Sequence, residues 1–111
     1  MIILGIDPGT TSIGYAVLSS ENRVPRLLDS GLLSVASPSP EERILKTHEE
    51  LSRLCVEWHP RAVAVEKLFF EKNRKTALAV SEVRGIILLT AVLQKITLFE
   101  YTPLEVKKSV T

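Results

Sequence analysis

The chain has 111 residues, a length typical of one globular domain with a substantial core and too short for two lobes. Apolar residues make up 45% of the chain and charged residues 24%, a balance that excludes a disordered or fibrous protein. The formal net charge of +1 excludes a general electrostatic attraction to nucleic acid, so any such contact depends on locally gathered basic residues.

The compartment is indicated by features that the chain lacks. A single cysteine, Cys55, excludes an intrachain disulfide framework and a cysteine-based metal site. The N-terminus has no basic-then-apolar secretory pattern, and apolar runs such as 86–89 are far too short to span a bilayer. We therefore expect a cytoplasmic protein that has no membrane association.

The first three predicted elements are strands. Residues 2–6 form an apolar run that ends at Asp7-Pro8-Gly9. Because apolar residues stand at both odd and even positions of this run, it predicts a central strand covered on both faces. Beyond the Pro-Gly turn, residues 13–18 predict a second strand antiparallel to the first. A turn at 21–25 and a third strand over 26–35 complete a meander.

The next predicted element is an amphipathic helix over residues 41–58. Ser39 is the predicted N-cap, Pro40 the first helical residue and Glu42 the acid that closes a capping box. The apolar positions fall mostly on one helical face, which predicts packing on the sheet. These positions are Ile44, Leu45, Leu51, Leu54, Cys55 and Trp58.

A second helix separates two further strands. Residues 62–65 predict a buried fourth strand, and the helix before it makes this strand parallel to the first, with a right-handed connection. The second helix is predicted over 75–95. Beyond Gly85 it is apolar around its whole circumference, so two of its sides must be covered, one by the sheet and the other by a partner subunit or a further element. A fifth strand is predicted over 96–101, and Thr102-Pro103 opens a third helix that the chain leaves incomplete at Thr111.

These elements predict an α/β fold with a five-stranded mixed sheet in the order 3-2-1-4-5, helices on both faces, and a single domain over 1–111. Asp7 and Glu66 then follow adjacent strands at their carboxyl ends, where open sheets bind ligands. Two close carboxylates repel unless a cation lies between them, and Mg²⁺ prefers oxygen ligands. Two such ions would support phosphodiester hydrolysis. The alternative is that each acid caps a helix or pairs with a basic residue.

A basic and aromatic segment follows Glu66. It comprises Lys67, Phe69, Phe70, Lys72, Arg74 and Lys75. Cations hold phosphates while an aromatic ring stacks on an unpaired base, so the segment predicts a nucleic-acid contact. The alternatives are that Phe70 belongs to the core and that Asn73 caps the following helix.

Two segments carry a resemblance to a known family. Residues 5–17, which contain Asp7-Pro8-Gly9, resemble the first active-site segment of RuvC-type Holliday-junction resolvases, and also the phosphate hairpin of actin-like ATPases and sugar kinases. Residues 63–78 with Val83-Arg84-Gly85 resemble the resolvases' central block and separate the nuclease from the kinase. Residues 99–101 and 106–108 resemble the stretch that follows, so the resemblance extends over the whole chain.

The resemblance implies a ribonuclease-H-like nuclease that resolves four-way DNA junctions in recombination and repair by paired, metal-dependent hydrolysis. It implies Asp7 and Glu66 as catalytic residues and metal ligands for two Mg²⁺ ions, or Mn²⁺. It also implies a homodimer that binds branched DNA and works with a branch-migration helicase complex. The residues that it assigns to DNA binding are Phe69, Lys72, Asn73, Arg74, Lys75 and Lys107.

The family pattern also includes carboxylates on a final helix that this sequence does not reach. Two readings follow: a junction-cleaving endonuclease, or a catalytically incomplete fragment, lacking its C-terminal helical part, that dimerises or binds junction DNA without cutting. A third reading, the phosphate-binding lobe of an actin-like ATPase or kinase, is disfavoured by the chain length and the second segment.

Overall fold

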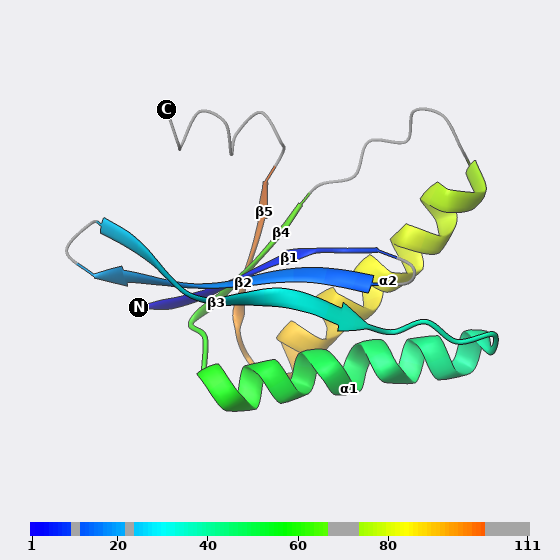
Figure 1. The fold of residues 1–111 in the computed structure, drawn as a ribbon, viewed down its shortest axis with the longest axis horizontal. Coiled ribbons are helices and arrows are strands. Elements are labelled where there is room, and N and C mark those ends of the chain that lie inside the picture. The colour runs from blue at the N-terminus through cyan, green and yellow to red at the C-terminus, as the bar shows by residue number, and fades with distance from the viewer. Residues whose placement is uncertain (10–11, 22–23, 67–73, 102–111) are drawn as a thin grey trace.

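The computed structural model describes residues 1–9, 12–21, 24–66 and 74–101. Five strands form one sheet in the order β3-β2-β1-β4-β5, which confirms the predicted mixed sheet (Figure 1). The elements are β1 (Ile2–Asp7), β2 (Ser12–Glu21), β3 (Val24–Ser34), α1 (Pro40–Trp58), β4 (Ala62–Glu66), α2 (Arg74–Leu93) and β5 (Thr97–Tyr101).

Strand β1 is the centre of the sheet. It pairs antiparallel with β2, as the Pro8-Gly9 turn predicts, and parallel with β4, as the helical crossover predicts. Strand β4 pairs in parallel with β5 at the opposite edge from β3. The hairpin of β2 and β3 is longer than predicted because its pairing continues to Glu21 and Val24.

The core lies on one face of the sheet. Leu4 pairs with Val17 and Val63, and these three side chains are fully buried on that face. Leu51 and Leu54 of α1 and Ile87 of α2 complete the same cluster. Burying such side chains contributes about 1.5–3 kcal/mol each, so this cluster holds both helices against the sheet.

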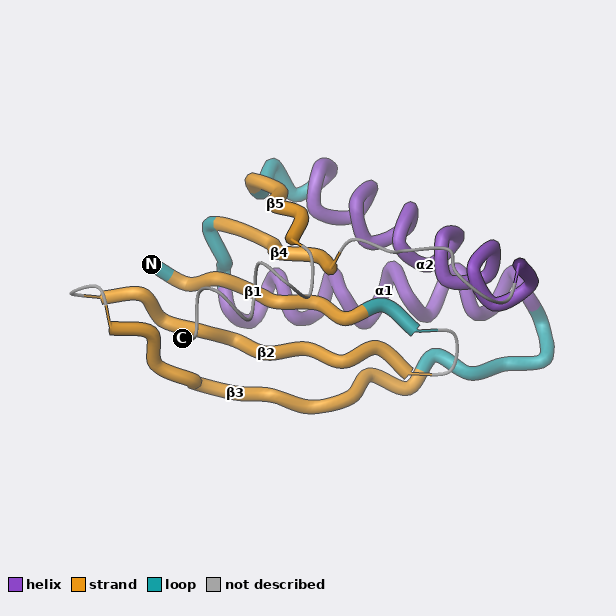
Figure 2. Tube along the Cα trace, turned by 90° about the horizontal axis from the view of Figure 1, so that it is seen from above, coloured by secondary structure: helices purple, strands orange, loops and turns teal. Residues whose placement is uncertain are grey.

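Helices α1 and α2 lie on the same face of the sheet (Figures 1 and 2). The described residues therefore supply helices for one of the two faces predicted to carry them, and the third helix expected from Thr102 lies outside these residues. Residues that alternate with the core positions point to the opposite face. Leu32 of β3 and Phe99 of β5 lie on it, and their side chains are 74% and 57% exposed.

Helix α2 has the two covers that its apolar circumference requires, and the second one is α1. His48 of α1 bonds through Nδ1 to the Thr90 hydroxyl at 2.8 Å. Because that hydroxyl donates its proton to the Ile86 carbonyl at 2.7 Å, His48 is the donor in this bond. None of the described helices combines the length and apolarity needed to cross a membrane.

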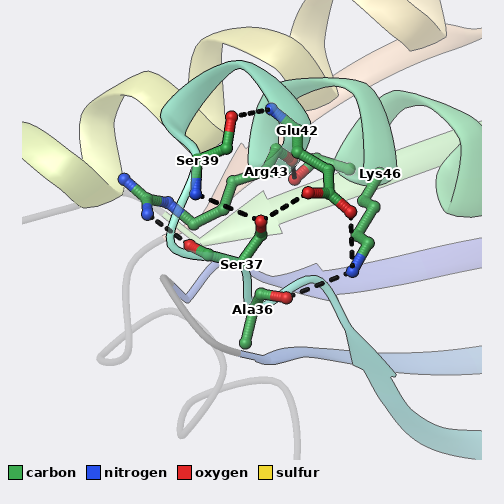
Figure 3. A network of polar contacts seen from close by, with 7 residues as sticks. Ala36, Ser37, Ser39, Glu42, Arg43 and Lys46 are labelled. Atoms are coloured by element: carbon green, nitrogen blue, oxygen red, sulfur yellow. Dashed lines mark hydrogen bonds and ion pairs between the residues drawn. The ribbon is translucent and has the colours of Figure 1, made fainter.

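The N-terminus of α1 confirms Ser39 as the N-cap, with a variation on the predicted capping box (Figure 3). The Ser39 hydroxyl accepts from the Glu42 amide at 3.3 Å. The Ser39 amide donates to the Ser37 hydroxyl, which itself donates to the Glu42 carboxylate at 2.8 Å. Ser37 thus closes the box indirectly, while Arg43 and Lys46 donate to carbonyls of the preceding loop.

Removing the cap tests its contribution to stability. We expect Ser39→Ala to lower the free energy of unfolding by about 1 kcal/mol, because an amide of the first helical turn loses its acceptor. Urea denaturation measures this change. Ser34→Ala, at an exposed position on the last residue of β3, is the matched control; equal losses in the two variants would contradict the capping role.

Candidate active site

The carboxyl edge of the sheet brings Asp7 and Glu66 together. Asp7 is the last residue of β1 and Glu66 the last residue of β4. The parallel register places Ile6 beside Val65, so the next residue on each strand is one of the two acids. Both alternate with buried core positions and therefore lie on the face opposite α1 and α2.

Strand β1 ends at Asp7. Pro8 has no amide proton to continue the ladder of β1. A Cβ atom on Gly9 would lie 2.2 Å from the Ser12 carbonyl oxygen, so only glycine fits there. The Asp7-Pro8-Gly9 sequence therefore ends β1 at the acid and returns the chain as β2.

The two acids interact electrostatically. Burial, the negative charge of Asp7 and a hydrogen bond with Asp7, in that order, raise the pKa of the Glu66 carboxyl. Bringing the two carboxyl groups together therefore disfavours the state in which both are ionised. Asp7 itself is exposed, so the pair lies at the rim of the sheet.

This donor set fits a divalent cation. Two carboxylates offer only oxygen ligands, which Mg²⁺ and Mn²⁺ prefer, and a cation between them would offset their repulsion. Among the described residues, no group of three or more His, Cys, Asp and Glu side chains gathers to hold a metal. Within the described ranges, Asp7 and Glu66 are therefore an acidic pair without a third such side chain beside them.

A third acid near this edge has a different position and partner. Glu100 of β5 lies beside Val65, on the face of the sheet that carries the helices. Its carboxylate forms an ion pair at 2.6 Å with Arg84 of α2. This ion pair joins α2 to the edge strand, and Glu100 is separate from the pair formed by Asp7 and Glu66.

The row of paired residues that crosses the sheet at Asp7 and Glu66 also includes two residues that the sequence did not single out. Gly14 of β2 pairs with Asp7, and Tyr101 of β5 pairs with Glu66. Counting register outward from a two-residue Pro8-Gly9 turn would have placed Thr10 opposite Asp7, so the observed pairing with Gly14 was not predictable from that turn. The position of Tyr101 depends on the residue register between β4 and β5, which the predicted strand order leaves open.

The predicted DNA-binding residues lie mostly outside the described residues. Phe69, Lys72, Asn73 and Lys107 belong to undescribed segments, and Arg74 and Lys75 begin α2 with only their backbone described. Their roles remain predictions. The chain from 67 to 73 connects Glu66 to the N-terminus of α2.

Comparisons with known proteins give one consistent family. The family model described as crossover junction endodeoxyribonuclease RuvC matches residues 3–111. A RuvC from Roseiflexus sp. (strain RS-1) is 44% identical over 107 residues, covering 96% of this chain and 64% of that protein. A RuvC from Ruminiclostridium cellulolyticum is 45% identical over 111 residues, covering 99% of this chain and 67% of that protein. This chain thus spans about two thirds of the length of these relatives.

A solved structure gives the same result. The structure of T. thermophilus RuvC in complex with Holliday junction substrate matches with a TM-score of 0.87 and 32% sequence identity. The match covers 97% of this chain and 70% of that one. The fold and the order of its strands are therefore those of a protein described with junction DNA.

The pKa of Glu66 predicts a pH-dependent stability. Because the pKa of Glu66 is raised in the folded state, this carboxyl stabilises the fold at pH values below its ordinary pKa, where it is protonated. That stabilisation is lost as the pH rises through the pKa of the folded state. At neutral pH without metal, ionised Glu66 opposes folding. We expect Glu66→Gln to raise the midpoint of thermal unfolding at pH 7, by an amount that shrinks as the pH falls.

Scanning calorimetry in chelator-treated buffer at several pH values measures this effect. Glu49→Gln, an exposed position on α1, is the control and should leave the midpoint unchanged. A Glu66→Gln midpoint below that of the unmodified protein at pH 7 would show that the two acids do not repel.

Proposed function

Because this chain belongs to the RuvC family of crossover junction endodeoxyribonucleases, we propose that it is the nuclease domain of a metal-dependent enzyme that resolves four-way DNA junctions. The observation that carries this proposal is the pairing of Asp7 and Glu66 on adjacent strand ends. The relative solved with a Holliday junction indicates branched DNA as the substrate. Since the chain spans about two thirds of its relatives, the activity of the whole protein is part of the proposal.

Asp7 and Glu66 are the proposed metal ligands. Asp7 and Glu66 would hold Mg²⁺ or Mn²⁺ together with the further ligands of a complete two-ion site, and the ions would supply activation of a water nucleophile and stabilisation of the leaving oxygen. Because a bound cation needs Glu66 in its ionised form and the pKa of this carboxyl is raised, loading would become more favourable as the pH rises. Asp7, exposed at the rim, is accessible to a phosphodiester that approaches the open face of the sheet.

The segment between β4 and α2 is the proposed junction contact. In chain order it begins directly after Glu66. We assign phosphate contacts to Lys72, Asn73, Arg74 and Lys75, and to Lys107 near the C-terminus, and we assign to Phe69 a position against an unpaired base at the branch point. This assignment is supported by the family pattern and by the chemistry of cations interleaved with aromatic rings.

A homodimer is the proposed assembly, and α2 is its proposed contact. Two sides of α2 are covered by the sheet and by α1, while Leu78, Leu89 and Val92 on a third side are 66%, 55% and 58% exposed. Leu78 and Val92 each lie about two turns from Gly85. Antiparallel packing of two copies across Gly85 would therefore place Leu78 against Val92 of the partner subunit, as two-fold symmetry requires.

Other parts of the proposal rest on the family. A cytoplasmic setting, a role in recombination and repair, and a branch-migration helicase complex as partner follow from the resemblance. The binding-only reading stays open as the second candidate, because the described residues contain two acidic ligands and no third. The family match favours a nuclease over the actin-like alternative.

Cleavage of a synthetic four-way junction in Mg²⁺ tests the function. We expect paired nicks, and a loss of about 10²-fold or more for Asp7→Asn, because electrostatic stabilisation of the transition state depends on the bound cation. Glu49→Gln is the control and should cut normally. Junction binding without cutting by the unmodified chain would support the binding-only reading, and cutting that survives Asp7→Asn would refute the assigned site.

Sedimentation tests the dimer. We expect the unmodified protein to be dimeric at micromolar concentration and Leu89→Glu to be monomeric, because burying a carboxylate in an apolar contact is strongly unfavourable. Leu45→Glu, at a similarly exposed position on α1, should remain dimeric. A monomer at all concentrations for the unmodified protein would refute the proposed contact.

A further inference from the structure

Gly14 lies inside β2, directly opposite Asp7. Glycine weakens a strand relative to alanine, because it loses more backbone freedom on folding and has no side chain to pack. A glycine within a strand therefore requires a local reason, either in the backbone or in the space around it.

The fold itself supplies no such reason. No described glycine has a positive φ, so the backbone at Gly14 suits any residue. A Cβ atom there would lie 3.5 Å from the Asp7 Cβ and 3.9 Å from Leu32 Cδ2, which are ordinary van der Waals contacts. Gly31 differs, since a Cβ there would lie 3.1 Å from the Tyr15 ring.

The space beside Gly14 borders the acidic pair. Leu32, Gly14, Asp7 and Glu66 follow one another across the sheet in one row, on the face opposite the helices. Glu66 lies on one side of Asp7 and Gly14 on the other. A side chain at position 14 would therefore begin against the Asp7 Cβ, on the side of Asp7 away from Glu66.

We propose that Gly14 is a space-keeping residue of the metal site, and this inference rests on the proposed function. Mg²⁺ retains several waters and is intolerant of distorted geometry, so an ion held by Asp7 and Glu66 needs room for water or phosphate oxygens beside them. Gly14 provides that room by having no side chain. A methyl group in contact with Asp7 would fill the space and restrict the orientations of the carboxylate.

The test is a graded series, Gly14→Ala and Gly14→Val, measured by Mg²⁺ calorimetry, thermal unfolding in metal-free buffer and junction cleavage. We expect the unfolding midpoint of Gly14→Ala to equal or exceed that of the unmodified protein. The Mg²⁺ dissociation constant should rise by about tenfold for valine and less for alanine, as for other residues that surround metal ligands. Cleavage should fall in the same order.

Gly5→Ala is the matched control. Gly5 lies on the same face of β1, two residues before Asp7, and a Cβ there would meet only the Ala16 carbonyl oxygen, at 3.8 Å. Its Mg²⁺ affinity and cleavage should be unchanged, and an equal loss in this variant would overturn the assignment to Gly14.

Two further outcomes separate this inference from the proposed function. If the unmodified protein binds Mg²⁺ and Gly14→Val binds it equally well, Gly14 keeps no space for the site, and the inference alone is wrong. If Gly14→Ala lowers the unfolding midpoint, the fold itself requires the glycine, and the inference is again wrong. Absence of Mg²⁺ binding by the unmodified protein would refute the metal site, and the inference with it.

Discussion

The parallel pairing of β1 with β4 is the constraint on which the rest of the structure depends. It places Leu4 beside Val63 and Ile6 beside Val65, and all four side chains are buried under the helices. One residue further along each strand, the same register places Asp7 beside Glu66 on the other face. A slip of one residue would expose the apolar side chains of one strand and separate the acids, because side chains alternate strictly between faces. Core packing and the candidate site are therefore set by a single interaction.

The acidic pair also shows where folding and function oppose each other. Glu66 has a raised pKa because it is partly buried beside Asp7, and Gly14 opposite Asp7 has no side chain although the fold has room for one. An amide at position 66 or an alanine at position 14 would suit the isolated fold better. Residues that a fold tolerates at some cost in stability are typical of functional sites. These two residues lie in one row of the sheet and point to the same edge.

The layering of the described residues explains how the site is reached. With α1 and α2 on one face, the acids lie on the opposite face, where Leu32 and Phe99 are exposed. The difference between a cutting and a binding-only protein then depends on ligands beyond the two described acids.

Local patterns were sufficient to determine the elements of this protein. Alternating and helical periodicity, the Pro-Gly turn after Asp7 and the Ser39 cap are properties of neighbouring residues, and they predicted the strand order and the position of both acids. Phe69, Lys72 and Lys107 stay predictions, since they lie outside the described residues. Only the tertiary structure decided that α1 is the second cover of α2, that both helices share one face, that Ser37 completes the helix cap and that Gly14 stands opposite Asp7. Each of these depends on contacts between segments far apart in the chain or on side-chain geometry, and periodicity carries no information about either.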